Sequence, residues 1–441
     1  MRVPSYAEQT PTFASGHSSP DDMLKRSLAR IDEREPEVKA FVHLARERAL
    51  REAEEATRRW HEGKPRSPID GLVVAVKDII ETEDMPTGQG SPIWTGFETR
   101  RDAASVQALR EAGAIILGKT ATTEFAATEQ NAPTANPHDP RRTPGGSSSG
   151  SAAAVGAGMV PVALGSQVVG STLRPASYCG CIGFKPSYGT LNRSGTYDHL
   201  SQSCVGLFGQ TLEDIWAVAQ AIATRVGGDP GERPLTGPET LPAARAPKRV
   251  AVLETAGWAK ATPGAVEAFE AELARLAAHG VEVVHRTMDG AVERLEEALS
   301  GAFPLTTRIN AWEMRWPLAG YVRSHPEGVS AAMRRRLVEA EAMTPADYAA
   351  ALEDRTHVRE IFADTLSRFD GAVALAATGA APLGLGYTGD PVMNVPASLL
   401  GVPAISLPLL EDQGLPLGLQ VMGLAGEDAA LMGLAAWRWT L

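Results

Sequence analysis

Short apolar runs alternate with helix-like stretches along this chain, and this alternation limits the folds open to it. Residues 73–80 form an almost continuous apolar run interrupted only by Lys77-Asp78, which predicts a buried strand that ends in a charged pair. Helix-like stretches at 103–111 and 151–158 are each followed by another apolar run. Strands that alternate with helices predict an α/β fold, with α/β/α layers around a large, mixed central sheet.

The second half of the chain adds further strand-like runs, at 372–375, 404–409 and 415–422. We expect them to join the same sheet, so that all 441 residues form one domain with a helical excursion. The expected divisions are N-terminal helices at 21–61 that meet at Pro36, a core at 70–226, a Pro/Gly-rich linker at 227–247, the helical excursion at 248–385 and the return to the sheet at 386–441.

Composition argues against several classes of protein. The chain is 44% hydrophobic and has a formal net charge of −11, which disfavours nucleic acid as its main partner. Its three cysteines suggest neither a disulfide framework nor a zinc site. No apolar stretch approaches a membrane span, and the N-terminus lacks the pattern of a signal peptide. We expect a cytoplasmic monomer or homodimer that acts on a small molecule, with no cofactor, metal, nucleic-acid partner or membrane partner.

Two catalytic or binding motifs match letter for letter but lie in the wrong surroundings. Residues 113–120 match the Walker A pattern, yet a helix precedes Gly113 and a strand-like run separates the two glycines, whereas a phosphate loop follows a strand and opens a helix. Residues 146–150 match the G-x-S-x-G nucleophile elbow, but the Pro- and Asn-rich stretch 136–144 cannot be the strand that must precede it. A flexible linker is also disfavoured there, because a small-residue helix and a buried strand follow at once.

A different set of residues fits better: Lys77 at a strand end, Ser147 after two glycines, and Ser171 in the run Gly-Ser-Gln-Val-Val-Gly-Ser. The Gly/Ser-rich run at 144–161 and the flanking segments Val74-Ala-Val-Lys-Asp and Tyr178-Cys-Gly-Cys-Ile-Gly-Phe-Lys-Pro closely resemble the amidase signature family of serine hydrolases. Within that family, the chain resembles bacterial aryl and alkyl amidases and related urethanases.

The resemblance implies a Ser–cis-Ser–Lys triad, with Ser171 as nucleophile, Ser147 as proton shuttle and Lys77 as base. A serine hydroxyl needs such a base, and Lys77 can serve only if burial lowers its pKa enough to leave it neutral. The cis peptide bond of the family would here be Gly146–Ser147. The oxyanion loop of the family would present the backbone N–H groups of Val168, Val169, Gly170 and Ser171. The implied activity is cleavage of amide C–N bonds through an acyl-enzyme.

Two departures from the family pattern bear on the substrate. Many members carry Asp-Thr-Gly-Gly-Ser where this chain has Gln167-Val-Val-Gly-Ser171, and the positive charge of Arg174 lies three residues after the nucleophile instead of two. These departures favour neutral aryl or alkyl amides, and by extension carbamates, over glutamine. Two alternatives stay open: a glutaminase-type subunit of an amidotransferase, and a catalytically silent, amidase-like binding protein.

Substrate specificity in the family depends on loops over the acyl pocket, which would here be 85–97, 126–131 and 302–323. The last of these is rich in aromatic residues, and it fits a helical core stripe and a mobile pocket wall equally well. Arg174 also fits a structural role inside its turn. The pocket residues that we predict are Met85, Gln130, Asn131, Arg174, Trp312 and Trp316.

Overall fold

A single mixed β-sheet organises the chain, whose computed structural model describes residues 4–127 and 133–441. Over these two ranges, the sheet has 11 strands in the order β1-β3-β2-β4-β6-β5-β10-β11-β9-β7-β8. β2 is parallel to β3 and β4, whereas β10 is antiparallel to β5 and β11. The strands are β1 Phe41–Leu44, β2 Val73–Lys77, β3 Ile115–Thr120, β4 Val162–Gln167, β5 Ile182–Lys185, β6 Cys204–Gly209, β7 Arg249–Val252, β8 Glu282–Val284, β9 Gly371–Leu375, β10 Ala404–Asp412 and β11 Leu415–Met422.

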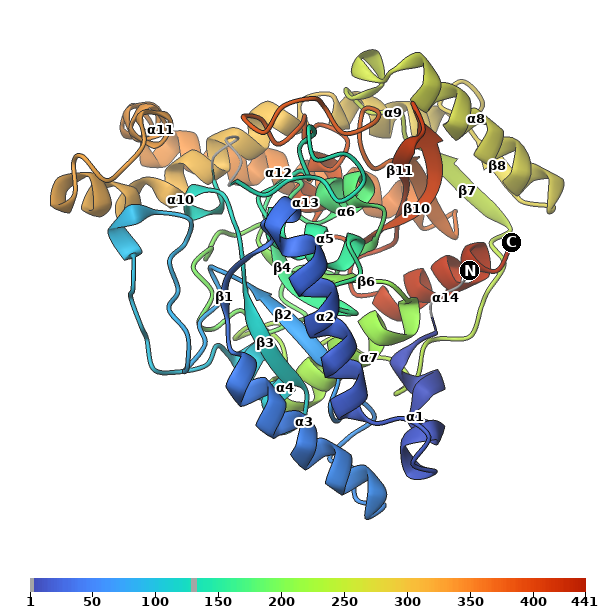
Figure 1. Cartoon of the computed structure of the whole chain (residues 1–441). Helices are drawn as coiled ribbons and strands as arrows, with labels where there is room; N and C mark the ends of the chain where they lie inside the picture. Colours follow the sequence, from blue (N-terminus) through green and yellow to red (C-terminus); the bar gives the residue numbers. More distant parts are fainter. Residues whose placement is uncertain (1–3, 128–132) are drawn as a thin grey trace.

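Helices cover both faces of this sheet (Figure 1), as the alternation of strand side chains requires. Val74 and Val76 pack into one apolar cluster with α4, α7 and α8, whereas Val73 and Ala75 pack into another with α2, α3 and α5. The helices are α1 Tyr6–Ala14, α2 Pro20–Val38, α3 Arg46–His61, α4 Ala104–Glu111, α5 Ser149–Gly156, α6 Leu173–Cys179, α7 Leu212–Val226, α8 Pro263–Ala278, α9 Gly290–Leu299, α10 Ala302–Ser324, α11 Ala331–Glu341, α12 Pro345–Leu366, α13 Val395–Leu400 and α14 Asp428–Trp439, with 3-10 turns η1 Pro92–Trp94, η2 Glu124–Ala126 and η3 Trp258–Lys260.

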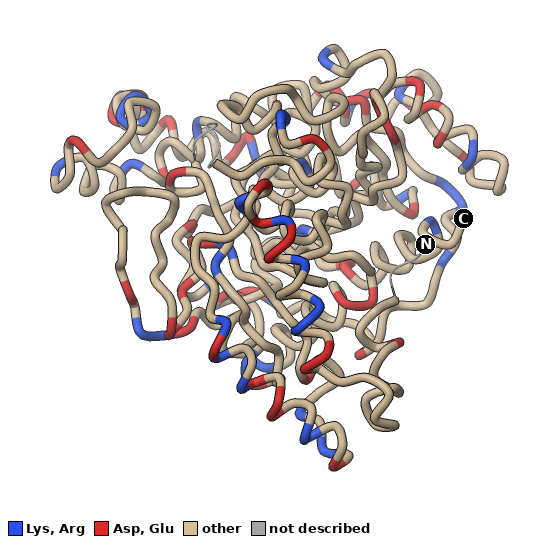
Figure 2. Tube along the Cα trace, viewed as in Figure 1, with Lys and Arg blue, Asp and Glu red and all other residues tan. Residues whose placement is uncertain are grey.

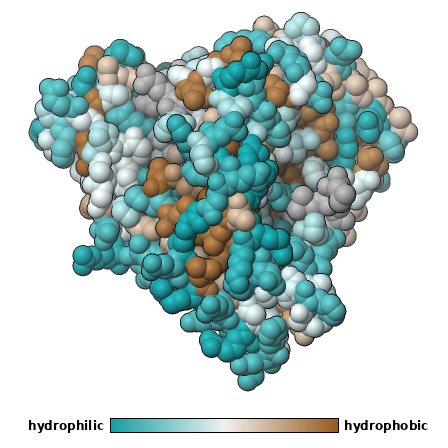
Figure 3. Space-filling model, viewed as in Figure 1, coloured by the Kyte–Doolittle hydropathy of each residue, from teal (hydrophilic) through white to brown (hydrophobic). Residues whose placement is uncertain are grey.

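The predicted α/β fold with one large mixed sheet is confirmed, because the strands of the second half join the sheet that the first half begins. Residues 227–247 contain no helix or strand and lead from α7 to β7. Both signs of charge are interspersed along the chain (Figure 2), and the visible face is mostly hydrophilic, with apolar patches near its centre (Figure 3). Within the described ranges, none of the helices combines the length and apolar character that a bilayer crossing demands.

The N-terminal region differs from the prediction at Pro36. α2 continues through Pro36 to Val38 and ends at Lys39, which has a left-handed backbone (φ 53°). A proline in the last turn interrupts little of a helix that is about to end. Residues 41–44 then form the edge strand β1, antiparallel to β3, so the segment 21–61 contains a strand between two helices.

Four helices, α9 to α12, lie between β8 and β9, within the predicted helical excursion at 248–385; the same stretch also contains α8 and the strands β7, β8 and β9. α10 and α11 project from the body of the molecule, at the upper left of Figure 1. A separate apolar cluster holds these two helices against the 3-10 turns η1 and η2. Its buried members are Phe125, Leu318, Val329, Met333 and Leu337.

Candidate active site

Lys77 is the last residue of a central strand, and its amine is enclosed completely. β2 lies between β3 and β4 and is parallel to both, so the carboxyl ends of these strands meet at one edge of the sheet. The Nζ atom of Lys77 lies 2.7 Å from Ser147 Oγ and 3.0 Å from Ser166 Oγ, and the residue is 0% exposed. Burial lowers the pKa of Lys77 to about 7, against the opposing effect of the Asp198 charge. A neutral amine is therefore available at physiological pH to accept a proton from Ser147.

Ser147 lies in a tight loop that leads into α5, and the peptide bond Gly146–Ser147 is cis. Two glycines allow this loop to pack closely against other segments. Gly145 has φ 82°, and a Cβ there would lie 2.7 Å from Pro175 Cα; a Cβ on Gly146 would lie 2.6 Å from Thr388 Cγ2. The order Gly-Gly-Ser therefore has a steric reason, because a side chain at either glycine would displace its neighbours.

Ser171 follows the end of β4 in a turn that leads into α6. Gly170 is buried, whereas Val168, Val169 and Ser171 are each partly exposed. The backbone N–H groups of these four residues donate to no group in the part of the chain that the structure describes. A turn of unpaired N–H groups beside a serine hydroxyl is suited to a developing oxyanion.

Arg174 ties the two serine loops together. Its guanidinium donates from Nη2 to the Gly146 carbonyl (2.7 Å) and from Nε to the Thr388 carbonyl (2.8 Å), and the residue is 4% exposed. The sequence allows either a pocket residue or a structural role here, and these contacts give Arg174 a structural environment.

Several polar residues around the candidate triad were not singled out from the sequence. Ser166 accepts from Lys77, and the buried carboxyl of Asp198 supplies the negative charge that acts on Lys77. Burial raises the pKa of Asp198, and Lys77 lowers it in part. Asp198 lies more than a hundred residues after Lys77 in a loop, so no local pattern points to it.

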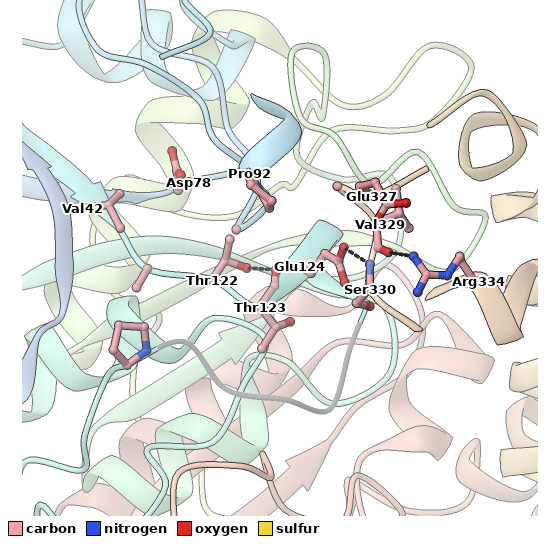
Figure 4. A pocket seen from close by; sticks show the side chains of 14 residues that line it. Val42, Asp78, Pro92, Thr122, Thr123, Glu124, Glu327, Val329, Ser330 and Arg334 are labelled. Atoms are coloured by element: carbon pink, nitrogen blue, oxygen red, sulfur yellow. Dashed lines mark hydrogen bonds between the residues drawn. The ribbon is translucent and has the colours of Figure 1, made fainter. Parts of the chain in front are cut away.

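A cavity of about 600 Å³ lies beside the segment 121–123 (Figure 4). This segment separates the cavity from the serine loop, because the Thr123 N–H donates to the Ser147 carbonyl (3.4 Å). On the other wall, the Glu124 carboxylate accepts from the Ser330 N–H (3.0 Å). The lining includes Gly90 and Pro92 from one of the predicted specificity loops, but it includes none of the three candidate triad residues.

The remaining predicted pocket residues have other surroundings. Met85 is 4% exposed and belongs to the main hydrophobic core. Trp312 stacks on Tyr348 of α12 (ring centroids 5.5 Å apart), and Trp316 is 85% exposed because it lies on the opposite side of α10 from the buried Leu318. Neither tryptophan lines the cavity. Gln130 and Asn131 lie outside the described residues.

The Walker-like match forms a strand, as the sequence context indicates. Its Gly118, Lys119 and Thr120 end β3, and Lys119 is buried. The Lys119 amine donates to Thr87 Oγ1 (2.8 Å) and lies 3.3 Å from Asp78 Oδ1. This lysine therefore anchors a loop and is not part of a phosphate-binding turn. The 146–150 match leads into α5, but within the described ranges a loop, not a strand, comes directly before it.

We expect kcat/KM to rise with pH along a limb centred near pH 7, because Lys77 must be neutral to accept a proton and its pKa is about 7. The charged group that acts on Lys77 is Asp198, and its carboxylate raises the lysine pKa. Replacing Asp198 with asparagine should therefore move the limb to lower pH. Rates with an uncharged anilide between about pH 5 and 9 would measure this, and an unmoved limb in Asp198→Asn would contradict it.

Comparisons with known proteins identify the family of the chain. The family model described as Amidase matches residues 22–432. A glutamyl-tRNA(Gln) amidotransferase subunit of Chloroflexus aurantiacus is 31% identical, over 95% of this chain and 93% of the relative. A solved structure described as an amidase superposes with a TM-score of 0.86 at 29% identity, covering 99% of both chains. The native peptide amidase of Stenotrophomonas maltophilia gives 0.79 at 25% identity, over 99% of this chain and 96% of that one. The chain belongs to the amidase signature family.

Proposed function

We propose that the chain is a serine hydrolase that cleaves the C–N bond of neutral aryl or alkyl amides through an acyl-enzyme on Ser171. The observation that carries this proposal is the contact of 2.7 Å between Lys77 Nζ and Ser147 Oγ. A buried lysine with a pKa of about 7, next to a serine hydroxyl, can act as a general base.

In the proposed reaction, neutral Lys77 accepts a proton from Ser147, and Ser147 accepts the proton of Ser171 as Ser171 Oγ bonds to the substrate carbonyl carbon. A hydroxyl can do this because it donates and accepts at once. The carbonyl oxygen becomes an oxyanion beside the N–H groups of residues 168–171. When the C–N bond breaks, the relay returns the proton to the leaving nitrogen. Water then attacks the acyl-serine through the same relay and releases the acid.

The surroundings of the turn support an uncharged substrate. The guanidinium of Arg174 is buried and donates to two backbone carbonyls, so its position suits a structural role better than recognition of a substrate carboxylate. Val169, beside the nucleophile, packs with Leu173 and Phe303 in an apolar cluster. Carbamates are included in the proposal because their carbonyl carbon undergoes the same tetrahedral attack.

A second function is favoured by the sequence comparison. The glutamyl-tRNA(Gln) amidotransferase subunits of several organisms are 31–33% identical to this chain, over 93–95% of its length. Under this alternative the same relay would release ammonia from glutamine for a partner protein. The two candidate functions differ in the acyl group that the site accepts, so one experiment separates them.

We expect kcat/KM for an acyl p-nitroanilide or an aryl carbamate to exceed that for free glutamine by at least about 100-fold, because the buried Arg174 guanidinium donates to backbone carbonyls and is poorly placed to pair with the glutamine carboxylate. Release of nitroaniline and of ammonia would be measured with the same enzyme, and Ser171→Ala would supply the blank. The reverse preference would support the glutaminase alternative. Failure of a fluorophosphonate probe to label wild-type Ser171 would support the silent binding protein.

A further inference from the structure

Two buried side chains from distant parts of the sequence hold the turn that carries Ser171. The Oε1 atom of Gln167 accepts the backbone N–H groups of Thr172 (2.9 Å) and Leu173 (3.0 Å). The Nε2 atom of Gln167 donates to Ser398 Oγ (3.0 Å), and Ser398 Oγ donates to the carbonyl of Val169 (2.9 Å). Both Gln167 and Ser398 are 0% exposed. These hydrogen bonds form one connected network on the side of the turn that faces Gln167 and Ser398, called the inner side below.

This chain of hydrogen bonds determines which way a peptide group of the turn faces. In a trans peptide the C=O and the following N–H point in opposite directions. Because Ser398 holds the Val169 carbonyl on the inner side, the N–H of Gly170 is directed to the other side. Position 170 is also closely surrounded, since a Cβ there would lie 3.0 Å from Asn394 Oδ1 and 3.1 Å from Arg174 Nη1.

The oxygen of the Gln167 side-chain amide accepts hydrogen bonds and its nitrogen donates one, which explains why a glutamine suits position 167. The oxygen accepts two N–H groups, while the nitrogen supplies a proton to Ser398 and leaves the serine hydroxyl proton for Val169. A carboxylate at position 167 could accept but could not donate, so it would compete with Val169 for the Ser398 proton.

We propose that Gln167 and Ser398 are positioning residues, which keep the Val168–Ser171 turn in the orientation that presents its N–H groups to the oxyanion. This inference rests on the proposed amide hydrolysis, because the oxyanion exists only in that reaction. Neither residue touches the reacting atoms; both act through the backbone of the turn.

Ser398→Ala tests the proposal. We expect kcat for an aryl amide to fall by about 10-fold to 100-fold with KM little changed, because loss of one oxyanion donor costs about 10²–10³ in kcat and this variant loosens a donor without removing it. Affinity for a trifluoromethyl ketone, whose adduct with Ser171 carries the oxyanion, should fall by a similar factor. Affinity for the corresponding alcohol, which forms no adduct, should stay the same.

Gln167→Glu provides a second variant of the same size. A carboxylate that accepts two backbone N–H groups stays ionised, so the new side chain would draw the Ser398 proton away from Val169. We expect the same selective loss as in Ser398→Ala, and little further loss in the double variant, because both changes remove the same hydrogen bond. If Ser398→Ala does not fold, Gln167→Glu alone still tests whether these two side chains orient the turn.

Ser187→Ala is the matched control. Ser187 is 3% exposed, and its hydroxyl donates to Asp428 (2.7 Å) and accepts from Gly426 (2.9 Å), so its replacement also removes two buried hydrogen bonds. It should lower the melting temperature without a selective loss of ketone affinity. If folded Ser398→Ala and Gln167→Glu bound the ketone as tightly as wild type, the positioning role would be wrong, while the proposed amide hydrolysis would still stand. A wild-type enzyme that neither hydrolyses amides nor binds the ketone would overturn the proposed function, and this inference with it.

Discussion

Replacing Ser171 with alanine is expected to lower kcat for amide hydrolysis by at least about 10⁴-fold, because the variant has no nucleophile to form the acyl-enzyme. KM should change little, since the hydroxyl contributes to the transition state more than to substrate binding. Steady-state rates with a p-nitroanilide would measure the loss. Mass spectrometry of the fluorophosphonate-treated proteins would show one adduct on wild type and none on Ser171→Ala.

Ser105→Ala is a suitable control for this experiment. Ser105 is 0% exposed in α4, and its hydroxyl has no hydrogen-bond partner among the described residues. Its loss should leave turnover and labelling at the wild-type level. Full turnover in Ser171→Ala would show that another group attacks the substrate, and it would remove Ser171 from the proposed reaction.

Replacing Lys77 with methionine is expected to abolish most of the activity while making the folded protein more stable at pH 6. The loss of the general base should lower kcat by about 10²–10⁴-fold. The gain in stability follows from the lysine pKa, which is about 7 in the folded protein against an ordinary value of 10.5. This difference corresponds to an unfavourable contribution on the order of 5 kcal/mol when the amine is charged. The hydroxyls of Ser147 and Ser166, which lose their partner, offset part of the gain.

The advantage of Lys77→Met should depend on pH in a defined direction. Below pH 7 the amine is protonated in both the folded and the unfolded chain, so wild type carries the full cost. Between pH 7 and 10.5 only the unfolded chain holds the proton. The unfavourable contribution of Lys77 to stability therefore becomes smaller as the pH rises through this window. Because the unfolded chain binds more protons there, the free energy of unfolding of wild type rises with pH. The difference in melting temperature between variant and wild type should therefore be largest at pH 6 and smaller at pH 9.

Lys119→Met offers a matched comparison in the neighbouring strand. Lys119 is as buried as Lys77, but it forms an ion pair with Asp78 (3.3 Å). Its removal leaves a buried carboxylate without its cation, so this variant should be less stable than wild type. No stabilisation by Lys77→Met at pH 6 would contradict the assignment of Lys77 as a buried amine whose contacts among the described residues are serine hydroxyls and not a carboxylate. Stabilisation by Lys119→Met would show that the cost of burial outweighs the ion pair with Asp78.

Much of the fold could be predicted from the sequence because the central strands are apolar and separated by amphipathic helices. The strands β2, β3 and β4 lie where the apolar runs are, and the later runs at β9, β10 and β11 return to the same sheet. The edge strand β1 escaped prediction because it has only four residues and follows a helix that tolerates Pro36. Local patterns say little about such a strand, since its stability depends on pairing with β3.

The candidate site was predictable to a smaller extent. Lys77, Ser147 and Ser171 lie in segments with a recognisable pattern, and the structure places Lys77 against Ser147. Residues 388 and 398 reach the site from more than 200 positions away, so only the folded chain shows their contacts with Arg174 and Val169. The aromatic residues of α10 have different surroundings, which their positions in the sequence do not show. Tyr321 packs on Phe125 (ring centroids 5.1 Å apart), whereas Trp316 is 85% exposed.

The order of strands has a consequence for how this protein behaves at high concentration. A sheet of 11 strands has two open edges, and open edges can recruit strands from other molecules. Here the edges are β1, with four residues and an irregular register between Phe41 and His43, and β8, with three residues. At β8 the charged Glu282 forms an ion pair with Arg249 (3.1 Å). Short, irregular and charged edges offer a poor template, so the sheet is protected from strand-by-strand polymerisation at both ends.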